Sequence, residues 1–113
     1  DMLLAGGTYE GRRILSPATV ACMTQAQLKD AVRRDMWDSL DGYSYGQLMR
    51  ICAEPGRIAG LACAGEYGWD GWLGTLFTND PATRSSLLMM LQRNGPWDRL
   101  VNLRVGVKKI LWE

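Results

Sequence analysis

Histidine is absent from this sequence of 113 residues. Without an imidazole, the chain cannot contain a Ser-His-Asp triad, a Cys-His dyad or a histidine metal site, and it lacks the commonest general base. A serine mechanism that uses lysine and tyrosine needs no imidazole, so that class of enzyme stays open. The sequence predicts neither a metal ion nor a cofactor.

Long apolar runs and an excess of one charge are missing as well. No stretch approaches the roughly 20 apolar residues of a membrane helix. Thirteen basic residues oppose 12 acidic ones, and the longest basic runs are pairs that we interpret as solvated surface, namely Arg12-Arg13, Arg33-Arg34 and Lys108-Lys109. Neither nucleic acid nor a membrane is therefore expected as a partner. The chain begins at Asp1 without a recognisable targeting segment, so the sequence indicates no particular compartment.

Cysteine is scarce, and the three thiols of Cys22, Cys52 and Cys63 do not have the spacing of metal ligands. Each has small or apolar neighbours, which predicts buried thiols that act as small hydrophobic side chains. A disulfide between two of them stays open. Hydrophobic residues make up 47% of the chain, and its length predicts a single domain over residues 1–113.

Local patterns predict one helix near each end of the chain. Ser16 can cap free N–H groups and Pro17 suits the first helical position, so a helix is expected from Pro17 to about Leu28. A second helix opens at Pro96 and continues to about Glu113. Its apolar stripe is predicted to consist of Leu100, Leu103, Val107, Ile110 and Leu111.

About three antiparallel strands are expected between these helices, at residues 43–52, 72–78 and 86–92. The charge-rich segment 29–41 before them is interpreted as an irregular loop in which Trp37 packs against an apolar surface. The predicted fold class is α+β, with an antiparallel sheet of about three strands and flanking helices.

The third predicted strand has five apolar residues in a row, which is typical of a strand buried on both faces. The terminal helix can cover only one of these faces. The first helix looks too short to cover the other. A missing N-terminal portion, or a second chain in a homo-oligomer, is therefore expected to complete the core.

The most informative stretch is residues 65–81, GEYGWDGWLGTLFTNDP, which is rich in glycine and tryptophan and ends in an Asn-Asp-Pro turn. It resembles the third motif of β-lactamase-like and penicillin-binding-protein-like serine hydrolases, including their esterase branch. That motif is a short triad ending in glycine, on the strand beside the nucleophile. Trp69-Asp70-Gly71 occupies the place that Lys-Thr-Gly or His-Thr-Gly has in many members. Gly74-Thr75 and Asp80-Pro81 match the continuation, and the resemblance extends over about residues 1–28 and 43–93.

The resemblance implies a role for each residue of the triad and for the residue after it. The backbone N–H of Trp72 would be one donor of the oxyanion hole. Gly71 would let substrate approach the backbone, and Asp70 would orient a neighbour in the site or cap the turn. Trp69 would form a wall of the pocket, and its lack of charge favours an ester or amide without a carboxylate. The bulk of Trp72 would either narrow the pocket or turn outward.

The nucleophile of this family has no counterpart in the chain. None of its serines is followed three residues later by lysine, as the family's Ser-x-x-Lys requires, and Tyr-x-Asn or Ser-x-Asn is missing too. The resemblance therefore implies the C-terminal portion of a β-lactamase-like serine hydrolase. It would be inactive alone and would supply the third-motif strand for acyl-serine hydrolysis of a small ester or amide. The alternative is a non-catalytic binding or assembly module that self-associates through its sheet.

Overall fold

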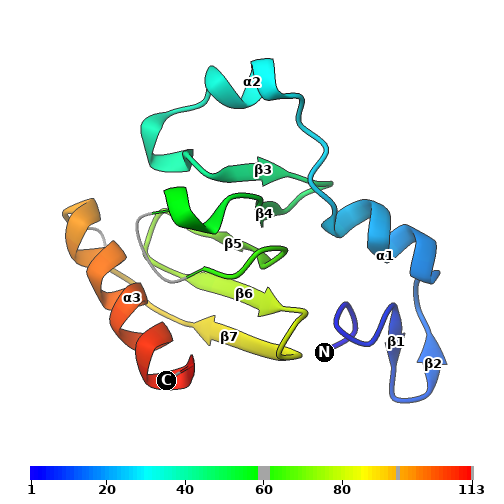
Figure 1. The fold of residues 1–113 in the computed structure, drawn as a ribbon. Coiled ribbons are helices and arrows are strands. Elements are labelled where there is room, and N and C mark those ends of the chain that lie inside the picture. Colours follow the sequence, from blue (N-terminus) through cyan, green and yellow to red (C-terminus); the bar gives the residue numbers. More distant parts are fainter. Residues whose placement is uncertain (59–61, 94, 113) are drawn as a thin grey trace.

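A computed structural model describes residues 1–58, 62–93 and 95–112. Its main element is an antiparallel sheet of five strands in the order β3-β4-β5-β6-β7, so that neighbours along the chain are neighbours in the sheet (Figure 1). The expected α+β class with an antiparallel sheet is confirmed, whereas the expected number of about three strands is too low. The strands are β3 (Tyr43–Tyr45), β4 (Arg50–Cys52), β5 (Tyr67–Asp70), β6 (Leu76–Asp80) and β7 (Ser85–Met89).

The additional strands have two origins: the predicted strand 43–52 contains a tight turn, and β5 lies before the predicted strand 72–78. The segment 43–52 folds back on itself where the Gly46 N–H donates to the Met49 carbonyl (3.0 Å) and Leu48 takes a φ of +64°. A Cβ at Gly46 would lie 2.1 Å from the carbonyl oxygen of Met23, so only glycine fits there. The chain turns again at residues 71–75, between β5 and β6. The first turn carries no Asn-Gly or Asp-Gly pair, the strongest sequence signal for a short hairpin, whereas the second begins at Asp70-Gly71.

Helix α1 (Pro17–Thr24) begins as predicted but ends earlier than Leu28. The Ser16 hydroxyl accepts a hydrogen bond from the Thr19 N–H (3.0 Å), as an N-cap should. Beyond the helix, the Gln27 N–H donates to the Tyr45 carbonyl (2.9 Å), so the chain follows the edge of the sheet instead of continuing the helix.

The segment 29–41 is more ordered than expected, with helix α2 (Asp30–Arg34) and the 3-10 helix η1 (Asp38–Leu40). The prediction that Trp37 packs against an apolar surface is wrong, because this side chain is 80% exposed. A further 3-10 helix, η2 (Pro55–Arg57), follows β4.

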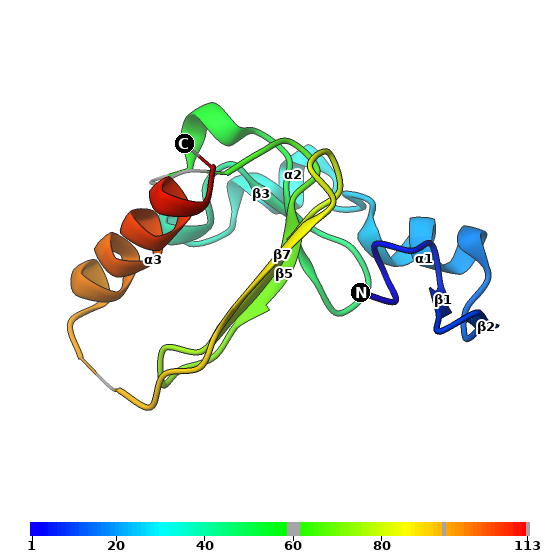
Figure 2. The same ribbon diagram turned by 90° about the horizontal axis from the view of Figure 1, so that it is seen from below.

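The two faces of the sheet are covered by opposite ends of the chain. Figure 2 shows the sheet edge-on between helix α3 (Trp97–Trp112) on one side and α1 with the two-stranded hairpin β1 (Thr8–Tyr9) and β2 (Arg12–Arg13) on the other. On the α3 side, Leu76, Leu87 and Met89 form a core cluster with Leu91 and Val107. On the opposite side, the cluster is Met49, Ile51 and Tyr67, packed against Leu3, Leu4, Met23 and Phe77.

Strand β7 has one buried face rather than the two that its apolar run predicts. Leu87 and Met89 are buried, but Leu88 is 68% exposed and the following Met90 is 74% exposed. Alternation of this kind follows from the pleat of the strand, with α3 covering one side. In the part of the chain that the structure describes, nothing covers the other side.

Helix α3 faces the sheet with only part of the predicted apolar stripe. Leu100 is buried and Val107 packs against the core cluster as expected, but Ile110 is 83% exposed. Arg104 and Lys108, one and two turns after Leu100, are buried against the sheet instead. The interpretation of Lys108 as solvated surface is therefore wrong, because it has an acidic partner in the sheet, described below. No helix within the described residues has the length and apolar character needed to cross a membrane.

Candidate functional site

Trp69 lies on β5, on the face of the sheet that is turned away from α3. It pairs directly with Phe77 across the strand, and Phe77 pairs in turn with Leu88. The edge of its ring meets Tyr45, with 5.6 Å between the ring centroids and an interplanar angle of 64°. The residue is still 45% exposed. Trp69 therefore presents an apolar, uncharged surface held in place by aromatic neighbours.

Residues Gly71–Gly74, which we call the motif turn, reverse the chain between β5 and β6. The Gly71 N–H donates to the Thr75 carbonyl (2.9 Å), and the Gly74 N–H donates to the Gly71 carbonyl (3.0 Å). A Cβ on Gly71 would lie 2.3 Å from the Thr75 hydroxyl oxygen, so a larger residue here would force the Thr75 side chain to move.

Trp72 occupies the second position of the motif turn, and its side chain is 85% exposed. Among the described residues, no group accepts a hydrogen bond from the Trp72 N–H. This donor is therefore available to an acceptor from outside the chain, as an oxyanion-hole donor must be.

Asp70 points to the opposite face from Trp69, because adjacent residues of a strand alternate. Its carboxylate accepts from Arg50 Nη1 on β4 (2.8 Å) and from Arg104 Nη1 on α3 (2.7 Å), and its side chain is only 10% exposed. The structure thus brings Trp69, Gly71 and Trp72 together but turns the Asp70 side chain away from them. Sequence reasoning missed both arginines. Strand alternation alone could have indicated that the Asp70 carboxylate faces the covering helix.

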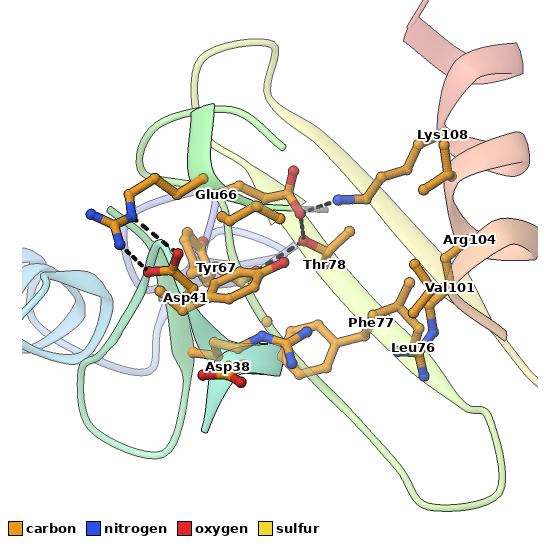
Figure 3. Close-up of a pocket in the computed structure, with 16 residues that line it drawn as sticks. Asp38, Asp41, Glu66, Tyr67, Leu76, Phe77, Thr78, Val101, Arg104 and Lys108 are labelled. Carbon is orange, nitrogen blue, oxygen red and sulfur yellow. Dashed lines mark hydrogen bonds and ion pairs between the residues drawn. The ribbon is translucent and has the colours of Figure 1, made fainter. Parts of the chain in front are cut away.

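A cavity of about 170 Å³ lies beneath α3, between the helix and the sheet (Figure 3). Glu66 lines the cavity, and its carboxylate accepts hydrogen bonds from the Thr78 hydroxyl (2.7 Å) and from the Lys108 ammonium. At its rim, Asp41 pairs with Arg57 (2.9 Å). The volume is below the roughly 300 Å³ at which small-molecule sites begin. Two of its acidic groups, Glu66 and Asp41, already have basic partners, so the cavity is better explained as packing around these ion pairs than as a substrate site.

The three cysteines are free thiols, of which only Cys52 is buried. The prediction of burial is wrong for Cys22 and Cys63, which are exposed. Burial raises the pKa of the Cys52 thiol to about 11, and the nearby Glu66 carboxylate adds to the effect. Because the thiolate is the reactive form, Cys52 is a poor nucleophile at neutral pH. Within the described ranges, no three histidine, cysteine, aspartate or glutamate side chains gather as metal ligands.

Comparison with known proteins supports a hydrolase-like fold. No family profile matches the sequence. The chain is 30% identical over 97 residues to an uncharacterized protein, MT1414, of Mycobacterium tuberculosis (strain CDC 1551 / Oshkosh) and to protein Rv1367c of Mycobacterium tuberculosis (strain ATCC 25618 / H37Rv). Each match covers 80% of this chain and 24% of the relative, so the chain spans about a quarter of the length of the curated relatives it matches.

Among solved structures, this chain is similar to EstCE1, described as a hydrolase with promiscuous acyltransferase activity. The TM-score is 0.74 at 20% sequence identity, and the match covers 99% of this chain and 27% of that chain. At this level of identity, the likeness concerns the fold. The chain therefore has a hydrolase-like fold.

Proposed function

We propose that this chain is the C-terminal segment of a β-lactamase-like serine hydrolase and supplies its third-motif strand and one oxyanion-hole N–H. The observation that carries the proposal is the motif turn at the end of β5. It presents the Trp72 N–H without an acceptor among the described residues, beside the exposed ring of Trp69. The fold similarity to EstCE1 over 99% of the chain is in line with it.

The proposed chemistry is acyl transfer through a serine that another part of the protein provides. The serine oxygen attacks the carbonyl of an ester or amide, and the resulting oxyanion accepts hydrogen bonds from the serine N–H and the Trp72 N–H. The alcohol or amine then leaves with a proton, and water hydrolyses the acyl-serine. This chain contributes the preorganised donor and one wall of the pocket, so alone it is inactive.

The proposed substrate is a small ester or amide without a carboxylate next to the scissile bond. Trp69, its cross-strand partner Phe77 and the Leu88 that pairs with Phe77 carry no charge, so these three residues offer no counter-ion to a substrate anion. In an active assembly we therefore expect neutral p-nitrophenyl butyrate to be hydrolysed faster than the p-nitrophenyl monoester of succinate. A Trp69→Lys variant should shift the preference toward the charged ester.

The test uses a chimera in which this chain replaces the matching segment of EstCE1. Trp72→Pro removes the N–H while keeping a residue that is favoured at the second position of a β-turn. Trp72→Ala is the matched control, because it removes the side chain and keeps the N–H. We expect Trp72→Pro to lower kcat for ester hydrolysis by about 10²–10³-fold, and Trp72→Ala to have a much smaller effect. Equal losses in the two variants would count against an oxyanion role for this N–H.

A second measurement uses the 113-residue chain alone. Because it lacks Ser-x-x-Lys, a fluorophosphonate probe should not label it. Stoichiometric labelling of one of its own serines would overturn the proposal.

The alternative function is a non-catalytic module that assembles through its sheet. The observation in its favour is β7, which pairs only with β6 among the described strands and exposes Leu88 and Met90. An exposed apolar edge strand is a template for pairing with another chain. This alternative predicts an inactive chimera. The hydrolase proposal predicts that this edge is completed by the remainder of the same protein.

A further inference from the structure

The motif turn is anchored from the far side of the sheet by a residue that is distant in sequence. Arg104 on α3 donates from Nη1 to Asp70 Oδ2 (2.7 Å), just before the turn. Its other terminal nitrogen, Nη2, makes a longer contact of 3.5 Å with the Thr75 carbonyl, just after the turn. One guanidinium therefore reaches both ends of the turn that carries Trp72.

The same contacts tie the turn to its neighbours. The Thr75 carbonyl that Arg104 approaches also accepts from the Gly71 N–H (2.9 Å), the hydrogen bond that closes the turn. The second oxygen of Asp70 accepts from Arg50 Nη1 on β4 (2.8 Å). The side chains of Asp70, Arg50 and Arg104 are 10%, 15% and 11% exposed. Charge-assisted hydrogen bonds shielded in this way are stronger and more directional than those of surface pairs.

We propose that Arg104, acting through Asp70 and the Thr75 carbonyl, is a positioning residue that fixes the direction of the Trp72 N–H. This inference rests on the proposed function, since it names what holds the oxyanion donor of that site. It gives Asp70 a role that differs from substrate binding: its carboxylate faces α3, while the next four residues form the motif turn. The arrangement makes the geometry of the donor depend on where α3 packs. Catalytic groups have to be held within about 0.5 Å of their productive geometry.

The first test measures amide hydrogen exchange in the 113-residue chain by NMR. In Arg104→Met, and more mildly in Arg104→Lys, the Gly71 N–H should exchange about tenfold faster as the turn opens locally. Amides in the middle of β6, such as that of Thr78, should change much less. The matched control is Arg57→Met, which removes an exposed pair with Asp41 and has no contact with the turn. Uniform acceleration across the sheet, or no change at Gly71, would overturn the positioning role.

The second test uses the EstCE1 chimera. Arg104→Lys should lower kcat about tenfold and leave KM nearly unchanged, because the loss concerns an interaction made in the transition state. Arg57→Met should change neither constant. An equal loss in both variants, or a loss confined to KM, contradicts the proposal. A chimera that is inactive in every form would sink the proposed function, whereas a missing local response at Gly71 in an active chimera would sink only the positioning role.

Discussion

The two faces of the sheet differ in their chemistry, although the same five strands build both. The face under α3 carries buried charges, with Asp70 between Arg50 and Arg104, and Glu66 bound to Lys108. The face turned away from α3 carries Met49, Ile51, Tyr67 and Phe77 in a cluster without charge, continued by Trp69 and Leu88. On the charged face these groups pair with one another beneath α3, whereas the apolar face is only partly covered.

This difference indicates which face is structural and which is available for function. Buried ions are tolerated only when each has a partner, so the charged groups under α3 are committed to one another. Exposed aromatic and aliphatic groups have no such commitment, and on the opposite face they include Trp69, two residues before the motif turn, and Leu88. Large exposed apolar surface marks a binding or assembly site in a folded protein.

The largest expected effect comes from breaking a pair on the charged face. Lys108→Met leaves the Glu66 carboxylate buried without its cation, and we expect it to lower the free energy of unfolding by about 3–5 kcal/mol. The double variant Glu66→Gln/Lys108→Met removes both charges and should recover more than half of that loss. Urea unfolding followed by tryptophan fluorescence measures both. A double variant as unstable as the single one would show that packing, not charge, dominates there.

The apolar face offers a contrast within one strand. Tyr67 and Trp69 lie on the same side of β5, but Tyr67 is 4% exposed and Trp69 is 45% exposed. Tyr67→Ala should lower the free energy of unfolding by about 3–5 kcal/mol, as for other buried aromatic residues. Trp69→Ala loses mainly the edge contact with Tyr45 and should cost about 1 kcal/mol or less. Thermal unfolding of the two variants measures this difference: a large loss identifies a core position, and a small loss identifies a position that contributes little to stability.

Alkaline pH should lower the free energy of unfolding because the buried Cys52 thiol then loses its proton. The unfolded thiol titrates near pH 9, and the folded one has a pKa of about 11. The folded state therefore holds the proton more tightly, so this contribution to stability is full below pH 9 and is lost as the pH rises toward 11. We expect a loss on the order of 2 kcal/mol over this range. Cys52→Ala should flatten the pH dependence, and identical slopes in the two proteins would refute the assignment.

The smallest change in stability is expected at the uncovered side of β7, where the oligomeric state is the sharper readout. Leu88 and Met90 are exposed, so Leu88→Lys and Met90→Lys should change the free energy of unfolding by no more than about 0.5 kcal/mol. The isolated wild-type chain is expected to self-associate through this surface, and the variants should shift it toward the monomer. Light scattering across a concentration series decides this. A monodisperse wild-type monomer would contradict the expectation.

Sequence reasoning identified the motif stretch but not its supports. Trp69, Gly71 and Trp72 adjoin in the chain, and the structure keeps them adjacent in space. Arg104 lies 34 residues from Asp70, and no local pattern joins the two. Lys108 was missed because a basic pair next to a helix end is usually solvated, and only the packing of α3 reveals Glu66 as its partner.

What the sequence determined by itself is local: the absence of histidine, the Ser16 cap, the α+β class and the glycine-rich motif at residues 65–81. These follow from residue chemistry and from spacings shorter than one turn or strand. Tertiary structure alone decided the five-stranded register, the single buried face of β7 and the side of the sheet to which Asp70 points. The physical reason is that these features depend on which surfaces meet. Whether a charge is buried and paired, or an apolar side chain is left exposed, depends on residues that lie far away in the chain.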